Sequence, residues 1–138
     1  MRKLVRFGVS MSPALFEKFN NIIREKGYAS RSEAIRDLIR DLIVQEEWKE
    51  SEKEAIASLT IVYNHAVRGI NDKLIEIQHR YHDNIISSMH VHIDEHNCME
   101  VLVIKGKTKQ IKKISDILIS SRGVKHGKLV MTSLTDNL

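Results

Sequence analysis

Cysteine, proline and aromatic residues are scarce in this sequence of 138 residues, which contains one Cys, one Pro and 5% aromatic residues. A single cysteine excludes an intramolecular disulfide bond and is typical of the reducing cytosol. Apolar runs are short: none approaches the ~18 residues that a membrane-spanning helix needs, and the first residues do not resemble a secretory leader. Because 42% of the residues are hydrophobic, the composition predicts a folded, cytoplasmic protein rather than a disordered one.

Charge and histidine are unevenly distributed along the chain. The excess of 22 Lys and Arg over 18 Asp and Glu gives a net charge of +4, which alone only hints at a polyanionic partner. Arg2, Lys3 and Arg6 concentrate positive charge at the start. All seven histidines lie between His65 and His126, together with Cys98. We therefore expect two domains, residues 1–50 and residues 51–138.

The first fifty residues predict a short strand and two helices. Residues 4–11 alternate in polarity, as a strand with one buried face does. Ser12-Pro13 is typical of a helix start, and Gly27 of a helix end. A second helix should begin at Ser30, which with Glu33 forms a capping-box pattern.

A single strand in so small a unit leaves its backbone hydrogen-bonding groups unpaired. Antiparallel pairing with the same strand of a second copy would satisfy them, and such two-stranded ribbons can enter the DNA major groove. The outward side chains, expected at the bases, are those of Arg6, Gly8 and Ser10. Phosphate contacts are expected from Arg2, Lys3, Ser30, Arg31 and Ser32. The alternative is a strand edge with a solvated polar face.

The second part of the chain alternates between strand and helix patterns in the order β-α-β-β-α-β. This order is that of the ferredoxin-like split arrangement, so the fold class as a whole is α+β. The expected elements are residues 55–66, 69–82, 85–93, 98–104, 110–120 and 124–134.

A candidate metal site lies in the predicted hairpin of this domain. Strand alternation places His90 and His92 on one face, and a turn at residues 94–97 returns the chain at Cys98. Two imidazoles and a thiolate are suited to a borderline divalent metal such as zinc, nickel or copper. Candidates for a fourth ligand are His65, His79, His82 and, least favoured, His96, whereas His126 has an equally good structural explanation. The alternative is an exposed polar face beside a partly buried cysteine.

Taken together, these residues resemble the nickel-responsive transcriptional regulator (NikR) family over essentially the whole chain. The matching motifs are Gly27-Tyr28, RSEAIRD from Arg31, Gln78-His79, His90-Val91-His92, Cys98, Arg122-Gly123-Val124 and His126-Gly127. The resemblance implies a ribbon–helix–helix domain followed by an ACT-like domain. It also implies a homotetrameric repressor, a dimer of dimers, whose affinity for palindromic double-stranded operator DNA rises when nickel binds.

The resemblance further implies one square-planar Ni(II) per subunit, held by His90, His92 and Cys98 of one chain and His79 of another. A weaker, potassium-binding site between the domains would use Glu33 and Asp37, with backbone carbonyls near Ile119, Ser121 and Val124. One departure is Gly8, which has no side-chain donor or acceptor, so base readout would depend on Arg6 and Ser10.

Three other functions are compatible with the same residues. One is a small zinc-dependent metalloenzyme in which His90, His92 and Cys98 leave a metal position open. Another is an ACT-type regulatory module that binds an organic effector, with incidental histidines. The third is an antitoxin-like ribbon–helix–helix protein, which the ordered second half disfavours.

Overall fold

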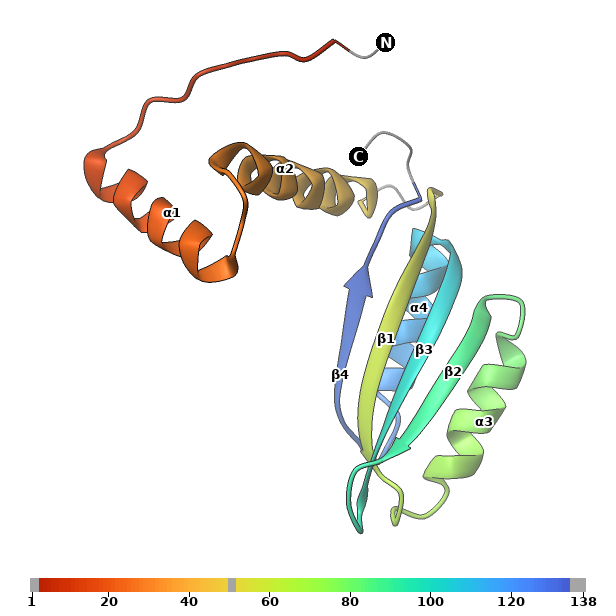
Figure 1. The fold of residues 1–138 in the computed structure, drawn as a ribbon. Coiled ribbons are helices and arrows are strands. Elements are labelled where there is room, and N and C mark those ends of the chain that lie inside the picture. The colour runs from red at the N-terminus through yellow and green to blue at the C-terminus, as the bar shows by residue number, and fades with distance from the viewer. Residues whose placement is uncertain (1–2, 50–51, 135–138) are drawn as a thin grey trace. The chain divides into compact units, whose positions relative to one another are not determined.

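The computed structural model describes residues 3–49 and 52–134 (Figure 1). The chain forms two compact units, one up to Asp41 and the other from Leu42 onward. No helix in the described residues is long and apolar enough to cross a membrane. The elements in chain order are α1 (Pro13–Lys26), α2 (Arg31–Glu47), β1 (Glu54–Asn64), α3 (Ile70–Arg80), β2 (Ile85–His92), β3 (Asn97–Lys107), α4 (Thr108–Ile119) and β4 (Val124–Met131).

In the first unit, α1 begins and ends where the sequence predicts. The side chain of Ser12 accepts a 3.2 Å hydrogen bond from the backbone N–H of Leu15, and Pro13 occupies the first helical turn. Gly27 ends the helix with a φ of 75°, and its N–H donates to the carbonyl of Arg24 at 3.2 Å. Only a residue that tolerates the left-handed region fits this position well.

The start of α2 confirms one half of the predicted capping box and contradicts the other. The backbone N–H of Glu33 donates to Ser30 Oγ at 3.1 Å, as expected. The Glu33 carboxylate does not reach back; it accepts hydrogen bonds from Arg36 at 2.7 Å and Arg40 at 3.2 Å. Two guanidinium groups on the following turns therefore compete successfully for this carboxylate, and they lower its pKa.

Much apolar surface of the first unit is exposed in a single chain. Residues 3–12 form neither helix nor strand, and Phe7 and Val9 are 67% and 61% exposed. Among the described residues of this unit, only Ile23 and Ala34 are buried. Exposed apolar surface of this extent is typical of an interaction site, and the intersubunit ribbon remains a prediction.

The second unit is a four-stranded antiparallel sheet in the order β2-β3-β1-β4, with α3 and α4 in the two crossover connections. Alternate residues of β1 and β3 are buried, whereas their neighbours are mostly partly exposed. The buried apolar residues of β1, β3, α3 and α4 form one hydrophobic cluster. This is the predicted βαββαβ arrangement, and all six predicted elements are confirmed.

The segment after α2 is attached to the second unit through Trp48. Its side chain is buried in the hydrophobic cluster, and its Nε1 donates a 2.9 Å hydrogen bond to the carbonyl of Thr132. Lys112 on α4 donates to the Trp48 carbonyl at 2.9 Å. A domain boundary at residues 50 and 51 remains a prediction, and the cluster extends upstream of it to Trp48.

Candidate metal centre

The candidate metal centre is built on the hairpin of β2 and β3. In its register His92 pairs with Cys98 and His90 with Glu100. The turn between the strands is closed by Asp94, whose carboxylate accepts hydrogen bonds from the Asn97 side chain and from the backbone N–H groups of His96 and Asn97. These hydrogen bonds lower the pKa of Asp94 to about 2, so the turn is held by a carboxylate at neutral pH.

This register brings the three predicted ligands together. Cys98 Sγ lies 3.4 Å from His92 Nδ1, and the His90 and His92 ring centroids are 5.0 Å apart. One ligand atom from each residue lies within 4.8 Å of the others, with Cys98 buried and both histidines exposed. Two imidazoles and a thiolate at this spacing fit a single divalent transition-metal ion.

Tyr63 and Glu100 lie beside His90, Gln78 contacts Glu100, and no local sequence pattern marks these three residues as a group. Tyr63 Oη lies 3.2 Å from His90 Nδ1, and a Glu100 oxygen lies 3.7 Å from the same nitrogen. The other Glu100 oxygen accepts a 2.7 Å hydrogen bond from the Gln78 amide. Contacts to Nδ1 orient the ring and leave Nε2 available to a metal, as outer hydrogen bonds commonly do for metal-binding histidines.

Burial alters the acid–base chemistry of this outer group. It raises the pKa of Tyr63 to about 12, with smaller contributions from the negative charges of Glu100 and Cys98. Burial also raises the pKa of Glu100, although the hydrogen bond from Gln78 and the electrostatic effect of His90 oppose the shift. Tyr63 therefore remains a neutral phenol throughout the physiological range.

Each of the two parts of the chain matches a known protein family. Residues 56–132 match the NikR C terminal nickel binding domain, and residues 5–46 match the ribbon-helix-helix protein, copG family. The chain belongs to the family of nickel-responsive regulators. This is a family of regulators and not of enzymes, so the metalloenzyme alternative is set aside.

Curated relatives named as nickel-responsive regulators span nearly the full chain. One from Caldanaerobacter subterraneus is 58% identical over 135 residues, covering 98% of this chain and 88% of the relative. One from Geobacter sp. (strain M21) is 56% identical over 138 residues, covering 100% and 99%. One from Thermococcus onnurineus is 59% identical over 131 residues, covering 95% of each.

A solved structure also shares part of this fold. The uncharacterized protein TM1266 from Thermotoga maritima has a TM-score of 0.53 at 22% identity, and the match covers 59% of this chain and 100% of that protein. At this identity the likeness concerns the fold alone.

The remaining histidines of this family member lie outside the three-ligand cluster in the described residues. His65 Nε2 lies 2.6 Å from the Glu95 carbonyl, and its ring is 6.2 Å from that of His92. His82 Nδ1 lies 3.0 Å from the His79 carbonyl. His79 itself is exposed on α3 and lines a shallow pocket of about 330 Å³ between α3 and β2. His96 and His126 are exposed.

The residues expected at DNA lie in the first unit. Lys3, Arg6, Gly8 and Ser10 are exposed in the extended segment before α1, and Arg2 lies outside the described residues. Ser30 and Ser32 are exposed at the start of α2. Arg31 Nε donates to Asn20 at 2.8 Å, and its guanidinium lies 4.7 Å from the Phe16 ring centroid, so this side chain is oriented by α1.

The residues expected at a second cation site have local partners. Glu33 pairs with Arg36 and Arg40, and Asp37 accepts a hydrogen bond from the Tyr28 hydroxyl. Ile119, Ser121 and Val124 span the end of α4 and the start of β4, in the other unit. The site remains a prediction.

Proposed function

We propose that this protein is a nickel-responsive repressor in which Ni(II) is held by four side chains from two subunits. His90, His92 and Cys98 of one chain would bind the ion together with His79 of the partner subunit. The observation that carries the proposal is the three-ligand cluster, to which the described residues of the same chain add no fourth member. His79 is exposed on α3 and is therefore accessible to the three-ligand cluster of a neighbouring subunit.

The choice of nickel rests on the donor set and on the relatives. Imidazole and thiolate ligands are compatible with zinc, copper and nickel alike. The relatives are named as nickel-responsive, and the matching domain is described as nickel-binding. A bound ion would cross-link subunits, with one ion expected per chain.

Two separate apolar surfaces support a tetramer built as a dimer of dimers. One is the exposed apolar surface of the first unit, which an intersubunit ribbon would cover. The other is at the β2 edge of the sheet, where Ile86 and Met89 of β2 and Ile93 just after it are each more than half exposed. Because β2 has a strand neighbour on one side only, a second copy could cover this surface and bring His79 to the cluster.

We assign DNA binding to the ribbon that two copies of the first unit would form. The protein would act in the cytoplasm. Arg6 and Ser10 would contact base edges, with Arg6 best suited to guanine. Lys3 and the start of α2 would contact phosphates and add affinity without sequence preference. A coupling of ~1–3 kcal/mol between the nickel and DNA sites would raise operator affinity about 5- to 150-fold.

The shared site is tested by mixing two inactive variants. His79→Ala and Cys98→Ala should each lose the Ni(II)–thiolate absorption of the wild type, whereas His126→Ala should keep it. Mixed tetramers of the two variants should regain about a quarter of the sites, because an intact cluster then meets an intact His79. A site confined to one chain would regain none, and that result would refute the intersubunit assignment.

The switch is tested by fluorescence anisotropy. A palindromic operator is first selected from random DNA. The protein should bind a duplex of this operator more tightly with stoichiometric Ni(II) than without it. Equal affinities would refute the metal switch, and an equal response to Zn(II) would refute nickel as the specific signal.

We further propose that Glu33 and Asp37, with the carbonyls of Ile119, Ser121 and Val124, form a potassium site that strengthens DNA binding. Replacing potassium by sodium at constant ionic strength should then weaken operator binding by the wild type. Asp37→Asn should abolish this difference. Identical affinities of the wild type in the two salts would refute the site.

A further inference from the structure

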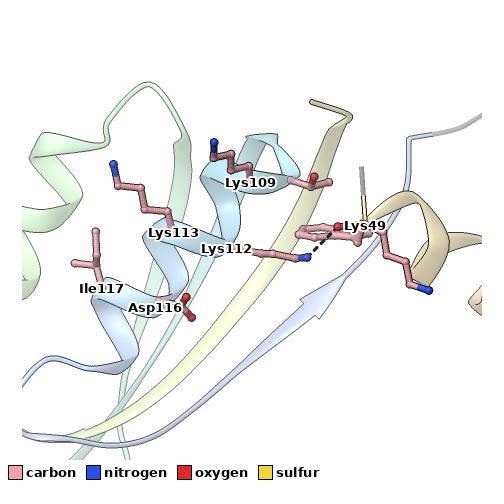
Figure 2. A pocket seen from close by; sticks show the side chains of 8 residues that line it. Lys49, Lys109, Lys112, Lys113, Asp116 and Ile117 are labelled. Atoms are coloured by element: carbon pink, nitrogen blue, oxygen red, sulfur yellow. Dashed lines mark hydrogen bonds between the residues drawn. The ribbon is translucent and has the colours of Figure 1, made fainter. Parts of the chain in front are cut away.

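A lysine-lined groove lies on the second unit, and none of its lining residues is a proposed nickel ligand. It has a volume of about 630 Å³ and runs between α4 and the segment that follows α2. Figure 2 shows Lys109, Lys112 and Lys113 projecting from α4. We call this the lysine groove, and its charged lining residues are Lys49, Lys109, Lys112, Lys113 and Asp116.

Two lysines of the lysine groove lack an ion-pair partner among the described residues, whereas Asp116 adds a negative charge to the lining and Glu52 lies within electrostatic range of Lys109. Lys109 and Lys113 are exposed and form no ion pair with any described residue. Lys112 donates to the Trp48 carbonyl, which holds its ammonium at the groove without removing its charge (Figure 2). Lys49 pairs with Glu46 at 2.8 Å. Such a surface attracts anions, because without them the neighbouring ammonium groups repel one another.

The form of the lysine groove favours an extended polyanion over a small ligand. It is wide and open, and its lysines are flexible point charges rather than a rigid, convergent set of donors. Duplex DNA presents one negative charge per ~1.7 Å of its axis, so several lysines can neutralise phosphates at once. The first unit of the same chain matches a ribbon-helix-helix family, so DNA bound there would lie close to the rest of the protein.

We propose that the lysine groove binds the phosphate backbone of duplex DNA as a second, sequence-independent contact. Lys109 and Lys113 are the principal phosphate contacts, and Lys112 is fixed beside them by Trp48. The contact adds affinity and salt dependence but does not read bases. It is independent of nickel coordination and of Arg6.

The affinity test uses the full-length double variant Lys109→Gln/Lys113→Gln, which retains the hydrogen bond from Lys112 to the Trp48 carbonyl. Its matched control is Lys73→Gln/Lys105→Gln, which removes two exposed lysines outside the groove. Binding to a 50-base-pair mixed-sequence duplex is measured by anisotropy over a NaCl series. The slope of log affinity against log salt should decrease by about one for each lysine in contact, and the control should match the wild type. An unchanged slope in the groove variant overturns the proposal.

A second measurement locates the contact directly. Lysine acetylation followed by mass spectrometry should show Lys109 and Lys113 protected by the duplex, with Lys73 unprotected. In an Arg6→Ala variant this protection should persist at saturating duplex, which separates the groove from base recognition. Protection by pyrophosphate but not by DNA would identify a small-anion site instead and overturn the proposal. Matching circular dichroism melting curves establish that the variants are folded.

Discussion

The side-chain amide of Gln78 donates a 2.7 Å hydrogen bond to the carboxylate of Glu100, which joins α3 to β3. Gln78 precedes His79 in the sequence, and Glu100 lies opposite His90 in the hairpin register. One hydrogen bond therefore connects the element that would donate a ligand to a neighbouring site with the strand pair that holds the chain's own site. A displacement of α3 would therefore shift Glu100, whose other carboxylate oxygen lies 3.7 Å from His90 Nδ1.

Gln78→Ala should lower the free energy of unfolding by about 1–3 kcal/mol, because the buried Glu100 carboxylate loses its amide donor. The measurement is urea denaturation of the metal-free protein at fixed concentration, since assembly contributes to stability. Gln45→Ala, at an exposed position late in α2, is the control. A loss no greater than that of the control would contradict this role of Gln78.

Tyr63→Phe should weaken Ni(II) binding by about 10- to 100-fold while leaving the three ligands in place, because the His90 ring loses a hydrogen-bond partner. With the pKa of Tyr63 at about 12, the phenol stays protonated from pH 6 to pH 9. The ratio of wild-type to variant affinity should therefore be constant over that range. Competition with a chelator measures this ratio, and Tyr81→Phe, at the residue that follows α3, provides the control.

Asp94→Ala should destabilise the hairpin turn at neutral pH and much less in acid. The pKa of Asp94 falls from 3.8 to about 2 on folding, so its charged form stabilises the folded state above about pH 4. That contribution is lost as pH falls toward 2. Thermal melting of wild type and variant should therefore show a gap that narrows between pH 4 and pH 2. A gap independent of pH would contradict the role of the carboxylate.

Gly127→Ala should destabilise the second unit by about 1–3 kcal/mol, because a Cβ there would lie 2.5 Å from Ile119 Cγ1 and 3.2 Å from Ile61 Cγ2. Ile61 is a fully buried residue of β1, and Ile119 is partly buried against the hydrophobic core at the end of α4, so both have little room to move. Gly8→Ala, where nothing lies within 4 Å of the added Cβ, should leave stability unchanged. Urea denaturation of the two variants tests the contrast.

The three-ligand cluster could be predicted from sequence because its geometry is local. Strand alternation places His90 and His92 on one face, and a short turn closed by Asp94 returns the chain at Cys98. Tyr63 was not predicted, because it reaches His90 through the pairing of β1 with β3, which are far apart in sequence. An available signal was Glu100, a charged residue that alternates with the apolar residues Cys98, Leu102 and Ile104 on the buried face of β3.

The N-terminus of α2 shows a different limit of sequence reasoning. Ser30 and Glu33 have the spacing of a capping box, yet the Glu33 carboxylate binds Arg36 and Arg40. The pattern identifies the helix start correctly because the Ser30 bond alone is sufficient. It does not decide among competing partners for a carboxylate, since that choice depends on which side chains lie on the following turns.

The unpaired segment before α1 has a consequence for how the protein responds to its own abundance. If the DNA-reading ribbon exists only where two chains meet, dilution below the dimer dissociation constant removes the reader itself. Binding curves against total protein should then be steeper than a simple hyperbola, even with nickel saturating. The amount of protein in the cell becomes a second input to the response, set by synthesis and turnover rather than by metal supply.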